Sequence, residues 1–136
     1  MTWDHKDEWH QRGKDFLVVV KHYTVEPHPI EGVNRWNVYA YIYPKHPHFG
    51  KFEGTAMYQD AASAMPFHAG PSFLRVHRAD DGNITSVQVG SDYNHIHDDE
   101  FGHMENMEQA WTVFQDAEEL FNWLTVRAER VMEVTA

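Results

Sequence analysis

Cysteine is absent from the 136 residues. This absence excludes disulfides, a thiol nucleophile and every cysteine-ligated zinc or iron–sulfur site. No apolar run approaches the roughly 18 residues of a membrane helix, and no apolar segment follows Met1. We therefore expect a cytoplasmic protein with no membrane segment. Hydrophobic residues make up 42% of the chain and charged residues 24%, which is typical of a globular domain.

Lysine and arginine are missing from one long stretch, between Arg78 and Arg127. The net charge is −10, while residues 1–50 are balanced at six basic and six acidic side chains. The stretch without cations therefore holds most of the acidic excess. Such a surface repels phosphate backbones, so we expect no direct nucleic-acid binding. It would attract a basic protein surface, although a solvated acidic face that only keeps the protein soluble is the simpler interpretation.

Residue patterning predicts a mostly antiparallel sheet of four or five strands. Phe16–Thr24 and Trp36–Tyr43 are rich in β-branched and aromatic residues. They could pair as an antiparallel hairpin, joined by a long loop that contains two prolines and a glycine. Ser72–Arg78 and Ile84–Gly90 flank the turn sequence Asp80–Asn83 and predict a hairpin. In this hairpin we expect Leu74, Val76, Val87 and Val89 on the buried face.

The C-terminal segment predicts a helix that covers one face of the sheet. We interpret Trp111–Phe114 as a fifth strand, followed by a capping box at Asp116–Glu119. A single helix begun by Asn106 is the alternative. Apolar residues then recur at three- and four-residue steps: Ala117, Leu120, Phe121, Leu124, Ala128, Val131 and Met132. The predicted fold is α+β, with a polar N-terminal arm over residues 1–15, helical or loose, and one domain over residues 16–136.

A dense polar cluster follows the predicted strand that ends at Gly90. In extended backbone, His95, His97 and Asp99 project to one side and could ligate a divalent metal such as zinc or manganese. His103, Asp92 or a residue of segment 44–71 could complete the ligand set. A polar loop whose side chains cap the local backbone is the structural alternative.

Three further histidines lie in segment 44–71, which is rich in proline and glycine. If this segment folds back over the sheet, His46, His48 or His68 could meet His95 and His97. We favour the simpler interpretation, in which these imidazoles lie on exposed loops.

Alternation in Trp36–Tyr43 places Tyr39, Tyr41 and Tyr43 on one face of the strand. A tyrosine stripe could anchor a protein interface or stack on a base or sugar. We favour a second packed face, covered by segment 44–71.

Residues 36–47, 86–95 and 113–121 resemble small uncharacterised proteins encoded by bacteriophages and prophages. This resemblance transfers no catalytic residues. It implies a phage protein that acts in the host bacterial cell on a defence system, in the manner of an anti-CRISPR or anti-restriction inhibitor.

Our leading hypothesis is a non-enzymatic inhibitor, without a cofactor, that binds a basic host protein. Its predicted contact residues are Asp92, Asp98, Asp99, Glu100, Glu105, Glu108, Tyr39 and Tyr41. Exposed aromatic residues could also form the interface of a homodimer. The alternative hypothesis is a metal-dependent hydrolase or phosphodiesterase centred on His95, His97 and Asp99.

Overall fold

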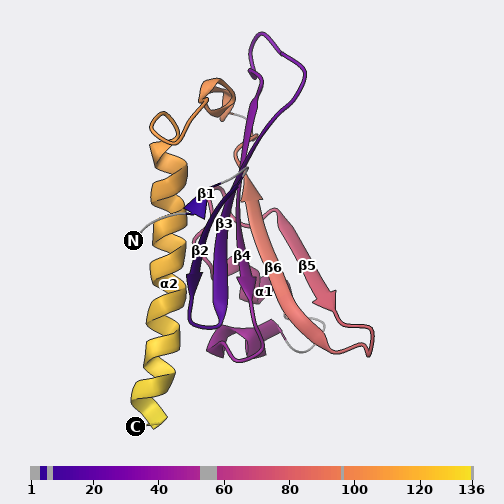
Figure 1. Cartoon of the computed structure of the whole chain (residues 1–136), viewed down its shortest axis with the longest axis vertical. Helices are drawn as coiled ribbons and strands as arrows, with labels where there is room; N and C mark the ends of the chain where they lie inside the picture. The colour runs from indigo at the N-terminus through magenta and orange to yellow at the C-terminus, as the bar shows by residue number, and fades with distance from the viewer. Residues whose placement is uncertain (1–3, 6–7, 53–57, 96, 136) are drawn as a thin grey trace.

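A computed structural model describes residues 4–5, 8–52, 58–95 and 97–135, with side chains over 8–52, 61–95 and 97–129. One antiparallel sheet and one long helix dominate it (Figure 1). The strands are β1 (Asp4–His5), β2 (Glu8–Gly13), β3 (Phe16–Thr24), β4 (Asn34–Ile42), β5 (Phe73–Arg78) and β6 (Ile84–Asp92). Their spatial order is β1-β2-β3-β4-β6-β5. The predicted α+β class is confirmed.

Both predicted strand pairs form, each with neighbouring strands antiparallel. β3 pairs with β4 from Phe16↔Ile42 to Thr24↔Asn34, and β5 pairs with β6 across the predicted turn. β6 also pairs with β4, so the two hairpins join into one sheet. In the second hairpin Val87 and Val89 are fully buried, whereas Leu74 keeps 38% of its surface exposed at the sheet edge.

The prediction of a polar arm over residues 1–15 differs from the structure, which pairs β2 with β3 along its whole length. Residues 8–13 are polar in composition, but Trp9 and Gln11 alternate with half-buried or exposed neighbours and point into the molecule. Trp9 stacks on Trp36 with ring centroids 5.7 Å apart. Only two side chains of this strand point inward. Such a short alternation in the sequence does not distinguish a strand from a loose segment.

The interpretation of Trp111–Phe114 as a strand was wrong. α2 (Trp111–Thr135) is one continuous helix that begins there, and Asn106 Oδ1 accepts a hydrogen bond from the backbone N–H of Gln109 just before it. The rejected alternative of a helix begun by Asn106 was closer to the structure. Val113 and Phe114 are buried because they extend the apolar stripe of Ala117, Leu120, Phe121 and Leu124 by one more turn.

The long helix α2 and two short helices pack on one face of the sheet. The core cluster joins this face, through residues such as Val18, Val38 and Val89, to α2, to η1 (Pro47–Phe52) and to α1 (Tyr58–Ser63). Another short helix, η3 (Asp99–His103), lies at the end of the sheet beside β4 and precedes α2. No helix among the described residues is long and apolar enough to cross a membrane.

The opposite face of the sheet, which we call the outer face, carries Tyr39 and Tyr41. The prediction that segment 44–71 covers these tyrosines was wrong for the described part of that segment. Phe49, Phe52, Ala61 and Met65 instead join the core on the helix face. Apolar side chains of the segment therefore complete the main core and leave the tyrosines half-buried among their sheet neighbours.

Candidate functional site

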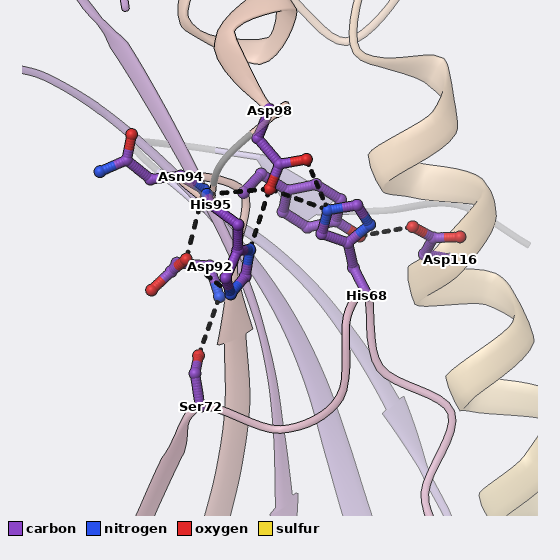
Figure 2. A network of polar contacts seen from close by, with 8 residues as sticks. His68, Ser72, Asp92, Asn94, His95, Asp98 and Asp116 are labelled. Atoms are coloured by element: carbon purple, nitrogen blue, oxygen red, sulfur yellow. Dashed lines mark hydrogen bonds and ion pairs between the residues drawn. The ribbon is translucent and has the colours of Figure 1, made fainter.

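Two loops meet at the end of the sheet where β6 finishes, and they bring His68, His95 and Asp98 together (Figure 2). His68 comes from the loop between α1 and β5, while His95 and Asp98 follow β6 and precede η3. The ring of His68 stacks on Tyr93 with centroids 4.3 Å apart, and Tyr93 is 3% exposed. The buried tyrosine thus fixes the position of a histidine that is 25 residues away in sequence.

The carboxylate of Asp98 lies at the centre of this cluster. His68 Nε2 is 2.9 Å from Asp98 Oδ1, and His95 Nδ1 is 2.9 Å from Asp98 Oδ2. The backbone N–H of His95 also donates to Oδ2, at 3.0 Å. One carboxylate therefore links both imidazoles and the loop backbone.

The charge of Asp98 is stabilised despite its burial. Burial alone would raise the pKa of this carboxyl, but the hydrogen bonds from the backbone and side chain of His95 and from His68 outweigh burial and lower the pKa below its usual range. Beneath the cluster, the hydroxyl of Tyr93 donates to Asp116 Oδ2 at 2.6 Å. Burial, together with this contact to a carboxylate, raises the pKa of Tyr93, so the phenol remains neutral.

His95 has a second carboxylate on its other nitrogen. Its Nε2 lies 3.5 Å from Asp92 Oδ1, while its Nδ1 faces Asp98. This is the arrangement in which a histidine ligates a metal through one nitrogen and is oriented by a carboxylate through the other. The side chains of His68 and His95 are 26% and 34% exposed, so solvent reaches the cluster.

Potential metal-binding atoms of His68, His95 and Asp98 all lie within 4.8 Å of one another. Two imidazoles and one carboxylate form a ligand set that suits zinc, manganese or iron(II). Three protein ligands would leave coordination positions for water, whose pKa a bound divalent ion lowers.

Only one of the four predicted metal ligands lies in this cluster. His95 is present, but His97 and Asp99 are exposed, and His97 has a φ of 79° that breaks the extended backbone assumed for the alternating pattern. His103 contacts the carbonyl of Ile30 through Nε2 at 2.9 Å. The loop turns at residues 95–98, so Asp98 replaces Asp99 as the carboxylate that faces His95.

The three histidines of segment 44–71 have different positions. His68 does meet His95, with ring centroids 5.8 Å apart, but it does not reach His97 in any described contact. His46 and His48 were expected on exposed loops, yet each is only 2% exposed. His46 Nε2 contacts the carbonyl of Leu124, and His48 Nε2 contacts that of Ala61, so both are core residues.

The predicted acidic contact residues differ in their exposure to solvent. Asp98 is buried and bound to both histidines, and Asp92 faces His95. Exposed carboxylates remain around η3 and before α2 at Asp99, Glu100, Glu105 and Glu108. Asp80 and Asp81 lie at the β5–β6 turn, at the other end of the sheet (Figure 1). The acidic residues therefore form at least two separate groups.

No protein-family model, curated protein or solved structure matches this chain.

Proposed function

We propose that this protein binds one divalent transition-metal ion through His68, His95 and Asp98 and uses it in a hydrolytic reaction. The observation that supports this proposal is the convergence of three ligand groups, from two separate loops, within 4.8 Å. Asp92 behind His95 and Tyr93 beneath His68 would orient the two imidazoles. Bound to zinc or manganese, the site would present an activated water to a substrate.

Titration of untagged protein with Zn²⁺ or Mn²⁺ tests this proposal. At a metal concentration 100 times the Kd, binding adds about 2.7 kcal/mol to the free energy of unfolding and raises the Tm by about 8 °C. His68→Ala and Asp98→Asn should each weaken metal binding at least tenfold, measured by calorimetry. Hydrolysis of bis(4-nitrophenyl) phosphate by the metal-loaded protein should fall in the same variants.

Matched controls come from the residues outside the cluster. His97→Ala and Asp99→Asn remove the same chemical groups from exposed positions of the same loop and should leave the metal affinity unchanged. Wild-type protein that binds neither ion, or a loss of affinity in these two controls alone, would contradict the proposed ligand set. Metal binding without hydrolysis would reject the catalytic part only.

A second candidate function is docking to a basic protein, for which the exposed acids around η3 provide the specific observation. Asp99, Glu100, Glu105 and Glu108 form no ion pair with any described lysine or arginine. They are thus available to a cationic partner, and the resemblance to phage proteins suggests a host-defence protein that normally holds nucleic acid.

Charge reversal of this acidic group tests the docking function. The Asp99→Lys/Glu100→Lys variant should lose a partner that the wild-type protein captures from bacterial lysate, because like charges would then face each other. Asp80→Lys/Asp81→Lys makes the same charge change at the other end of the sheet and should retain the partner. Equal capture by the two variants would remove support for docking through η3. Asp98 is unsuitable for this test because it is buried against His68 and His95.

A further inference from the structure

The outer face of the sheet has no described helix against it, yet it is partly apolar. Val19 is only 1% exposed but does not belong to the core cluster on the helix face. Tyr39 extends over Gly90, where an added Cβ atom would lie 2.3 Å from the tyrosine ring, and its ring meets Phe73 at 5.5 Å. Phe73 itself remains 39% exposed. This face therefore presents a shallow aromatic centre.

Strand register arranges the outer face in three parallel rows across the sheet. The first row is Glu8, Lys21, Asn37 and Asp92. The second row is His10, Val19, Tyr39, Gly90 and Phe73. The third row is Arg12, Leu17, Tyr41, Gln88 and Arg75. The carboxylates of Glu8 and Asp92 thus lie in the first row, on one side of the second row. The guanidinium groups of Arg12 and Arg75 lie in the third row, on its other side.

This arrangement is complementary to itself under a twofold rotation about the second row. The rotation keeps each strand opposite its own copy and exchanges the first row with the third. Glu8 then faces Arg12 of the second copy, and Arg75 comes diagonally opposite Asp92. The second row, which contains Tyr39 and Phe73, packs on its own copy along the axis.

We propose that the outer face is the interface of a homodimer, in which two sheets pack face to face with the second rows on the twofold axis. Neither Arg12 nor Arg75 forms an ion pair with a carboxylate in the described part of the chain. Glu8 contacts Lys21 at 3.6 Å and His10 within its own chain, and it is still about one-third exposed. Burial of Phe73 and Tyr39 contributes the apolar part of the interface.

The sharpest test of the dimer exchanges the charges of Glu8 and Arg12. The molar mass in solution is measured by light scattering and by sedimentation. Wild-type protein at 100 μM should have twice the 15.9 kDa mass of the chain. Arg12→Glu or Glu8→Arg alone places like charges opposite each other twice and should weaken the dimer at least tenfold. The combined Glu8→Arg/Arg12→Glu variant restores opposite charges across the axis and should recover most of the affinity.

Two controls separate loss of the interface from loss of the fold. Lys51→Glu also replaces a positive side chain with a negative one, as Arg12→Glu does. Because Lys51 lies on η1, on the helix side of the sheet, this variant should leave the dimer intact. Phe73→Glu should give a monomer with an unchanged circular dichroism spectrum. A monomeric wild-type protein, or failure of the combined variant to recover the dimer while it remains folded, overturns the proposal.

Discussion

At the residue scale, His46 and His48 show how a titratable side chain can serve as a core residue. His46 Nδ1 accepts the backbone N–H of His48, and its Nε2 donates to the carbonyl of Leu124. His48 donates through Nε2 to Ala61, while its Nδ1 has no hydrogen-bond partner among the described residues. Burial lowers the pKa of His46 and lowers that of His48 to about 4. Both imidazoles are therefore neutral in the folded protein at neutral pH.

This burial predicts a loss of stability in mild acid. The unfolded chain binds a proton at His48 near pH 6.5, but the folded chain does so only near pH 4, so the stabilisation is complete above pH 6.5 and declines as the pH falls toward 4. Between pH 7 and pH 5 we expect His48 to lower the free energy of unfolding by about 2 kcal/mol. Urea denaturation at the two pH values measures this difference.

The matched variant for this prediction is His48→Gln, which keeps a polar side chain but does not titrate. Its stability should be lower than that of the wild type at pH 7, because the packing against Phe52 and Trp123 changes. The decline toward pH 5 should nevertheless be smaller in the variant. An equal decline in both proteins would assign the acid sensitivity to other groups.

At the scale of elements, the contact between η3 and the β3–β4 loop depends on glycine. A Cβ atom at Gly102 would lie 1.5 Å from the carbonyl oxygen of Glu31, and Gly32 has a φ of 70°. Asn34 Nδ2 donates to the carbonyl of Gly102 across the same contact, and Trp36 Nε1 donates to that of Met104. The backbone of η3 is thus held directly against the start of β4.

Gly102→Ala should therefore separate η3 from the β3–β4 loop. The expected cost is about 1–3 kcal/mol in the free energy of unfolding, since the added methyl group has no space beside the backbone of Glu31. Gly50→Ala is the control, because nothing lies within 4 Å of an added Cβ there, and its effect should stay within about 0.5 kcal/mol. Chemical denaturation of both variants checks the prediction, which fails if the two changes cost the same.

Sequence patterning predicted the elements whose residues repeat with a regular period. The β3–β4 and β5–β6 hairpins and the apolar stripe of α2 are of this kind. It misplaced the start of α2, because Trp111–Phe114 has strand composition and only its packing against β2 and β3 identifies it as helix. The candidate site was predicted only in part. His95 was identified, but Asp98 depends on a loop turn, and His68 depends on stacking with Tyr93.

At the scale of the whole molecule, the two faces of the sheet have different roles. One face, with α2, η1 and α1, holds almost all the buried apolar side chains, and the outer face remains uncovered by any described helix. The histidine cluster lies at one end of this two-layer arrangement, where loops rather than strands supply the side chains. Binding chemistry and stability are therefore located in separate parts of the fold.

The order of the elements along the chain has a consequence for biosynthesis. The strands that carry Val18, Val38 and Val89 leave the ribosome before α2, the helix that shields them. At translation rates of roughly 5–20 residues per second, the nascent sheet would expose this apolar surface for several seconds. Association with chaperones during synthesis would be a direct cost of placing the covering helix after the strands that it shields.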